Sequence, residues 1–169
     1  MESMNNFKIK NNFSIFLRDY LLSISLIVLC FLSDRISKIK IIQQQENGST
    51  LYINDFINFD LVWNSGIGFG FFSSQPVLIY NLITLLISVV IIILIFLMLK
   101  SKVIDKIMFA LIAGGALGNV YDRIIYAAVP DFIDIHYNTF HWFTFNIADI
   151  FISIGIVVII SKDLLFKND

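Results

Sequence analysis

Four aspartates stand at or near the ends of long apolar stretches of the sequence: Asp34, Asp122, Asp131 and Asp149. A charged side chain at membrane depth costs about 2.5–3.5 kcal/mol on insertion scales and by default marks a function. Two carboxylates that are held close together do not both ionise readily, so the pair shares one proton. One can then activate a water molecule while the other protonates a departing amine. These residues indicate aspartic peptide hydrolysis or, with the same acids used as a relay, a proton or ion pathway.

The spacing of the acids limits which of them can form a pair. Asp131 and Asp149 are 18 residues apart, which is about 27 Å on one continuous helix. They can meet only if the chain leaves one helix, crosses the outer face and re-enters as the next. Asp122 could meet Asp149 in the same way, but its neighbour Arg123 favours a structural ion pair. Asp149, near a helix start, could also simply complement the helix dipole.

Other polar residues have simpler interpretations. His136 and His141 are five residues apart with no third ligand at metal-site spacing, so the sequence predicts no metal. Asp55 and Asp134 are expected to be solvated loop acids. Cys30 is the one cysteine and cannot form an internal disulfide.

The segment AGGALGN has the spacing of small residues that lets membrane helices approach closely. It contains Gly114, Gly115 and Gly118 and ends at Asn119. Asn119 and Asn146 each stand near a span end, where a hydrogen bond between helices is the expected role.

The composition identifies the kind of molecule that must position these residues. The chain has 169 residues, of which 57% are hydrophobic and 15% charged, and its mean hydropathy is +0.81. A soluble chain carries roughly 25% charged residues. The net charge of −1 gives no basic excess for binding phosphates. These values exclude an ordinary cytosolic domain, a disordered chain and a nucleic-acid binder, and they indicate a small integral membrane protein.

The apolar stretches predict four transmembrane helices within a single membrane-embedded domain, residues 1–169. A helix needs about 20 apolar residues to cross the hydrocarbon of a bilayer. The expected spans are residues 12–33, 76–99, 103–128 and 144–165. No small-residue cleavage site follows the first span, which argues against a removable signal peptide.

The basic residues predict the orientation of these spans. Of the 12 Lys and Arg residues, eight lie with the termini and the loop after the second span, and four lie on the other side. The positive-inside rule therefore places both termini in the cytoplasm and gathers the aspartates at the outer face.

Two segments lie outside the spans on that outer face. Residues 41–74 are polar at first and then alternate in apolar runs such as LYINDFINFDLVW, which is typical of strands. Residues 131–143 are rich in aromatic side chains and are expected to form a segment lying at the membrane interface.

Four sequence blocks match a known family in order and spacing. They are DRISK at residues 34–38, NSGIGFG at 64–70, GGALGNVYDR with VPDF over 114–132, and FNIAD at 145–149. Together they make the chain resemble bacterial lipoprotein signal peptidase, or signal peptidase II, over nearly its whole length. The resemblance implies an all-α membrane fold of four transmembrane helices, with a small β-rich cradle and an interfacial helix on the outer face. The implied location is the bacterial cytoplasmic membrane.

The same resemblance implies an activity and a set of residues. Members remove the signal peptide from diacylglyceryl-modified prolipoproteins, just before the lipidated cysteine, with two aspartates and no metal or cofactor. By motif position these catalytic acids fall on Asp131 and Asp149, with Asp122 as the runner-up. Substrate-binding or supporting positions fall on Asp34, Lys38, Asn64, Gly66, Gly115, Asn119, Asp122, Arg123 and Asn146. The expected partners are the prolipoprotein and membrane lipid, and the chain is expected to act as a monomer.

Three positions depart from the family pattern. Gly68 and Gly70 replace the usual alanine and serine, which removes a hydroxyl from that loop. Pro130 replaces the common valine before the first catalytic acid and biases Val129 toward extended geometry.

The sequence disfavours the transporter alternative because a relay needs polar groups across the full depth of the bilayer. The span at residues 76–99 is almost bare of them, apart from Asn81, Thr84 and Ser88.

Overall fold

Four long helices and one small sheet make up the fold. The computed structural model describes residues 2–45, 50–66 and 77–165, with side chains from residue 17 onward in the first range and from residue 78 in the last. The helices are α1 (Glu2–Gln44), α2 (Val77–Lys100), α3 (Val103–Tyr126) and α4 (Ile147–Leu165). The strands are β1 (Leu51–Asn54), β2 (Ile57–Asn64), β3 (Val129–Tyr137) and β4 (Phe140–Phe145).

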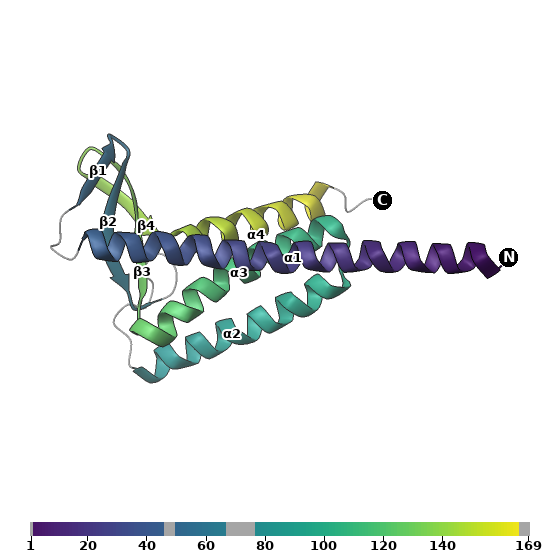
Figure 1. The fold of residues 1–169 in the computed structure, drawn as a ribbon. Coiled ribbons are helices and arrows are strands. Elements are labelled where there is room, and N and C mark those ends of the chain that lie inside the picture. Colours follow the sequence, from purple (N-terminus) through teal and green to yellow (C-terminus); the bar gives the residue numbers. More distant parts are fainter. Residues whose placement is uncertain (1, 46–49, 67–76, 166–169) are drawn as a thin grey trace.

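The sheet lies at one end of the helices, whereas α1 begins and α4 ends at the other end (Figure 1). Three stretches are long and apolar enough to cross a membrane: Leu17–Gln44, Leu78–Lys100 and Val103–Tyr126. Helix α4 is not among these three stretches, since its 19 residues include Asp149, Lys162 and Asp163. The structure therefore supports a mostly helical membrane protein, and the fourth span stays a prediction.

Helix α3 is the centre of the bundle and contacts α1, α2 and α4. Its glycines allow this, as the small-residue pattern predicts. A Cβ atom on Gly114 would lie 2.8 Å from Cys30 Cβ of α1, and one on Gly115 would lie 2.6 Å from the Ala148 carbonyl oxygen of α4. Any larger residue at these two positions would push the helices apart.

The helix that contains the predicted first span does not end at residue 33. Helix α1 continues to Gln44 without a break, so Asp34, Arg35 and Lys38 lie inside it. All three side chains are buried. Charged residues are tolerated there because Asp34 and Lys38 pair within α1, Asp122 of α3 pairs with Arg35 and Lys38, and a backbone N–H of α4 donates to Asp34.

The sheet is antiparallel in the order β1-β2-β3-β4. Strands β1 and β2 fall within the segment 41–74 in which alternation predicts strands. The aromatic residues 131–143, which are expected at the membrane interface, belong to the β3–β4 hairpin, and β3 pairs with β2. Their position at the interface stays a prediction. Within residues 2–45, 50–66 and 77–165 there is no separate interfacial helix of the kind that the resemblance implies.

A small hydrophobic cluster joins the sheet to the bundle. Ile41 at the end of α1 packs with Phe132 and Ile133 of β3, and all three are buried. The chain passes from Tyr126 of α3 into β3 through Ala127, whose left-handed backbone (φ 52°) ends the helix. Strand β3 is thus fixed directly above the ends of α1 and α3.

Candidate active site

Asp131 and Asp149 come from different elements and meet where the sheet joins the bundle. Asp131 lies near the start of β3 and is 3% exposed. In the β2–β3 pairing Val62 faces Asp131 and Asn64 faces Val129. Because alternate residues share one face of a sheet, Asn64 and Asp131 are diagonal neighbours. The Asn64 amide accordingly donates to Asp131 Oδ2 at 2.9 Å.

Asp149 is fixed by the geometry of a helix start. Asn146 caps α4, and its side-chain oxygen accepts from the Asp149 backbone N–H at 3.1 Å. Asp149 Oδ2 accepts in return from the Asn146 backbone N–H at 3.1 Å. This reciprocal pair is a capping box. The remaining oxygen, Asp149 Oδ1, accepts from the Asn119 side-chain amide of α3 at 2.9 Å.

Asn146 links the two acids. Besides capping α4, its side-chain amide donates to Asp131 Oδ1 at 2.6 Å. Burial, together with the negative charge of Asp149, raises the pKa of Asp131 to about 6. A buried carboxylate with a raised pKa and a half-buried one beside it are suited to hold a single proton between them.

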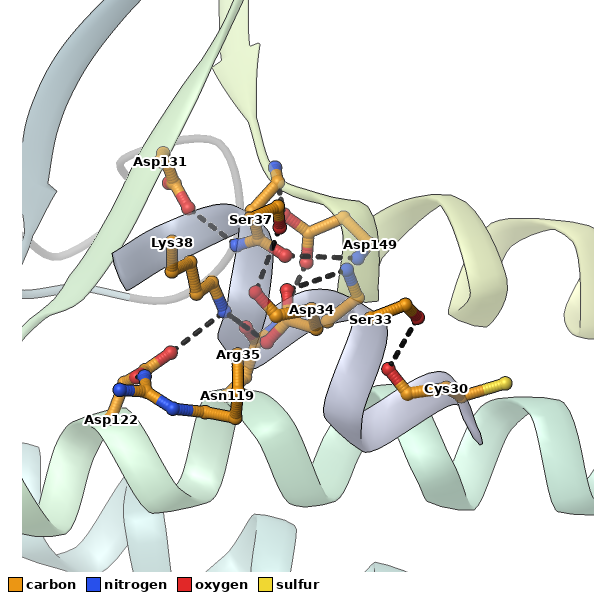
Figure 2. A network of polar contacts seen from close by, with 12 residues as sticks. Cys30, Ser33, Asp34, Arg35, Ser37, Lys38, Asn119, Asp122, Asp131 and Asp149 are labelled. Atoms are coloured by element: carbon orange, nitrogen blue, oxygen red, sulfur yellow. Dashed lines mark hydrogen bonds and ion pairs between the residues drawn. The ribbon is translucent and has the colours of Figure 1, made fainter. Parts of the chain in front are cut away.

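A second, charged layer lies beneath the pair and is centred on Lys38. Figure 2 shows its ammonium group between Asp34 and Asp122. The nitrogen donates to Asp34 Oδ2 at 2.7 Å, to Asn119 Oδ1 at 2.8 Å and to Asp122 Oδ2 at 2.7 Å. All three ammonium donors are therefore used, and none of the Lys38 side chain is exposed. Asn119 carries the contact onward, because it accepts from Lys38 and donates to Asp149.

Among the described residues, Asp122 does not form the expected ion pair with Arg123. Asp122 pairs instead with Arg35 and Lys38 of α1, and its side chain is fully buried. Adjacent residues on a helix point in different directions, so Asp122 faces α1 whereas Arg123 turns toward the chain after β2. Arg123 donates to the Gly66 carbonyl at 2.9 Å and to the Asn119 carbonyl at 3.2 Å.

Arg35 is a site residue that the sequence reasoning missed. It binds Asp122, donates to the Tyr126 hydroxyl at 3.2 Å, and stacks 4.7 Å from the ring centre of Tyr121. The signal was present, since Arg35 stands inside the DRISK block.

The other predicted supporting residues gather around this centre. Asp34 Oδ1 accepts from the Ala148 backbone N–H at 3.0 Å, which ties α1 to the start of α4. Gly66 donates its N–H to Asn64 Oδ1 at 2.9 Å in the turn after β2. Gly115 touches no acid and serves the packing of α3 on α4. Gly68 and Gly70 lie outside the described residues.

Asp134 is not the solvated loop acid that the sequence suggests. It is 4% exposed on β3, and His141 Nδ1 of β4 lies 2.7 Å from its Oδ2. Asp55 is exposed, as expected, in the turn between β1 and β2. Among the described residues no group of three or more His, Cys, Asp and Glu could hold a metal ion.

Comparison with known proteins identifies relatives of this chain. The family profile of signal peptidase (SPase) II matches residues 26–165. The lipoprotein signal peptidase of Pelagibacter ubique (strain HTCC1062) is 50% identical over 154 residues, covering 90% of this chain and 93% of that protein. The lipoprotein signal peptidase of Francisella tularensis subsp. mediasiatica (strain FSC147) is 39% identical over 130 residues, covering 73% and 79%.

Solved structures agree with these sequence relatives. A bacterial membrane enzyme determined by the in meso method matches with a TM-score of 0.75 and 28% identity, covering 87% of this chain and 90% of that one. A second structure, also of a bacterial membrane enzyme, matches with a TM-score of 0.71 at 28% identity, covering 88% and 94%.

Proposed function

The chain belongs to the signal peptidase II family, and on that premise we propose that it removes signal peptides from diacylglyceryl-modified prolipoproteins as an aspartic endopeptidase. Family membership supports a bacterial membrane protease that processes lipoproteins. The aspartic chemistry is our inference from the site. The observation that carries it is the pair of carboxylates, Asp131 and Asp149, joined by Asn146 and held by amide donors.

In the proposed mechanism the two acids share one proton and hold a water molecule. The ionised carboxylate takes a proton from the water as the water oxygen attacks the scissile carbonyl carbon. A tetrahedral intermediate forms and the carbonyl π bond opens onto its oxygen. The protonated carboxyl group then gives its proton to the amide nitrogen as the C–N bond breaks, releasing the lipid-modified cysteine as the new amino terminus. The raised pKa of Asp131 supports a protonated partner near neutral pH.

The amides would orient the acids without competing for the proton. Asn64, Asn119 and Asn146 each donate to a catalytic carboxylate, and a neutral amide is not itself a base at these pH values. Arg123 is proposed to donate to a substrate carbonyl near Gly66, where its guanidinium already faces a backbone oxygen.

Asp122 is the less suitable catalytic acid. Both of its oxygens face cations, Arg35 and Lys38, and neither partner can leave without exposing a buried charge. We therefore assign Asp122 a supporting role, in which it anchors α3 to α1 under the catalytic pair.

We also propose a topology with the site at the outer face of the bacterial cytoplasmic membrane. Helix α1 begins and α4 ends away from the sheet (Figure 1), and eight of the 12 basic residues belong to the side of the termini. All four helices would then cross the membrane, with both termini cytoplasmic. The acyl chains of the substrate would remain in lipid beside a monomeric, cofactor-free enzyme.

Cleavage of a defined substrate tests the proposal. Purified protein in lipid-supplemented detergent is mixed with a diacylglyceryl-modified prolipoprotein and, as a control, with the same protein lacking the modification. Mass spectrometry should find a product that begins at the modified cysteine, formed also in the presence of a chelator, and no product from the control. A folded protein that cleaves neither substrate would refute the proposed function, and ion flux in sealed vesicles would then be measured.

A further inference from the structure

A cavity with polar and apolar walls lies between the beginning of α2 and the end of α3, and Arg123 of the candidate site lines it. Its volume is about 380 Å³, at the lower end of the range of small-molecule sites. Its walls combine donors and apolar groups: Ser65, Tyr80, Asn81, Thr84, Arg123, Ile124 and Ala127. The proposed mechanism uses Arg123 from this set and leaves the polar residues of α2 without a role.

Those residues need explaining because α2 is the most apolar of the three candidate spans, with a mean hydropathy of 3.4. Thr84 and Ser88 satisfy their hydroxyl groups within the helix, donating to the carbonyls of Tyr80 and Thr84 at 3.0 and 2.8 Å. The Asn81 side chain has no hydrogen-bond partner among the described residues. An unpaired amide facing a lipid environment is costly, so Asn81 is suited to bind a polar group that enters the cavity.

Arg123 lines the cavity on the side of the catalytic pair. Like Asn81, it has a donor group without a partner among the described residues. Its two terminal nitrogens donate to Gly66 and Asn119, but Nε is buried without a partner in the part of the chain that the structure describes. Asn119 in turn donates to Asp149. A ligand that contacts Arg123 would therefore be linked to Asp149 through Arg123 and Asn119.

The lining selects for a hydrogen-bond acceptor without a positive charge. It offers the Asn81 amide and the Arg123 guanidinium as donors and contains no carboxylate among its described residues. Ile124 lines it with apolar surface, and α2, which supplies Asn81, also carries exposed leucines such as Leu82 and Leu85. Acyl chains attached to the bound group could leave along this surface into the bilayer. An uncharged ester carries this combination of a carbonyl oxygen and a hydrocarbon chain.

We propose that this cavity binds the ester carbonyl oxygens of a glyceryl lipid, with Asn81 as the residue that recognises them. This inference rests on the proposed function, since the diacylglyceryl group of the substrate carries two such esters. Glycerolipids of the bilayer carry the same groups and are the second possible source.

Replacing esters with ethers tests the proposal, because an ether-linked dialkylglyceryl group keeps the chains and lacks the carbonyl oxygens. Cleavage of the two substrates is compared for wild type, Asn81→Leu and the control Ser88→Ala, which lies on the same helix outside the cavity. Loss of a neutral hydrogen bond predicts a KM about three- to tenfold higher for the ether substrate in wild type and Ser88→Ala, with kcat unchanged. In Asn81→Leu the two substrates should have the same KM.

The outcomes separate the two sources and the two proposals. In a second comparison, the ester phospholipid added to the detergent is replaced by ether phospholipid. If this replacement raises the KM of wild type but not that of Asn81→Leu, the cavity binds bilayer lipid. Equal KM values for esters and ethers in wild type, or the same discrimination in Asn81→Leu, would overturn the inference while leaving the peptidase proposal intact. Absence of all cleavage would instead refute the proposed function.

Discussion

At the scale of single residues, the site consists of two layers with different roles. The upper layer holds Asp131 and Asp149 with neutral amides, and the lower layer neutralises Asp34 and Asp122 with Lys38. The layers communicate through Asn119, which bonds to both Lys38 and Asp149. Substitutions in the lower layer are therefore expected to reduce stability, and substitutions in the upper layer to change proton sharing and with it the pH dependence of stability.

Removal of the Lys38 charge should mainly reduce stability. Lys38→Met leaves two buried carboxylates without their common cation, and breaking a buried ion pair in this way costs about 3–5 kcal/mol. We expect thermal unfolding in detergent to show a clear fall in Tm. Lys40→Met, exposed on the same helix, is the control and should change Tm little. Equal changes in the two variants would contradict the network described here.

Titration of Asp131 should make stability depend on pH. Its folded-state pKa of about 6 is above the ordinary value of 3.8, so the folded protein binds the proton more tightly. The contribution of Asp131 to the free energy of unfolding should therefore be fully present below about pH 4 and be lost as pH rises to about 6. Asp131→Asn cannot ionise and should not show this loss. Between pH 4 and pH 7, the free energy of unfolding of Asp131→Asn should therefore rise by up to about 3 kcal/mol relative to that of wild type.

Thermal unfolding at several pH values measures this difference, with the exposed Asp55→Asn as the control. Parallel curves for wild type and Asp131→Asn would show that the carboxyl group is not perturbed as described.

At the scale of elements, close packing of α3 holds the acids in place. A Cβ atom on Gly118 would lie 2.5 Å from Asp34 Oδ2, a carboxylate that also binds Lys38 and whose other oxygen binds the Ala148 N–H. Gly118→Ala should displace Asp34 and destabilise the protein by about 1–3 kcal/mol. Ile125→Ala, on the exposed side of the same helix, is the control. An unchanged Tm for Gly118→Ala would mean that α1 and α3 adjust freely.

The same elements show how far sequence reasoning reaches. The close helix contacts were predicted from the glycines of α3. The set of residues at the candidate site was predicted from the four motifs. The capping box was not predicted, although Asn146 and Asp149 have the N-cap and N3 spacing. The continuation of α1 through Asp34 and Lys38 was not predicted, since Asn119 and Asp122, which bind Lys38 from α3, are more than 80 residues away in the chain. The β3–β4 hairpin was missed because its many aromatic residues were interpreted as a segment at the membrane interface, and the alternation of residue types along it was not considered.

At the scale of the whole molecule, the sheet marks one end and the beginning of α1 and the end of α4 mark the other. The β3–β4 turn at Thr139 should therefore lie outside the cell and the α2–α3 connection at Ser101 inside. Thr139→Cys should react with a membrane-impermeant maleimide in intact spheroplasts, and Ser101→Cys only after lysis. The native Cys30 is buried, so wild type supplies the background. Labelling of Ser101→Cys from outside would reverse the proposed orientation.

The central claim is that Asp131 and Asp149 together cleave the peptide bond, and substitution of each acid tests it most directly. Asp131→Asn and Asp149→Asn are compared with Asp122→Asn and with Asp134→Asn, a buried acid on the same strand as Asp131 that lies outside the site. Each variant is first checked for folding by thermal melt, and cleavage of the lipid-modified substrate is then measured. Folded Asp131→Asn and Asp149→Asn should each lose about 100- to 10,000-fold in kcat, whereas Asp134→Asn stays active. An active Asp131→Asn beside a folded but inactive Asp122→Asn would contradict the account and make Asp122 the partner of Asp149.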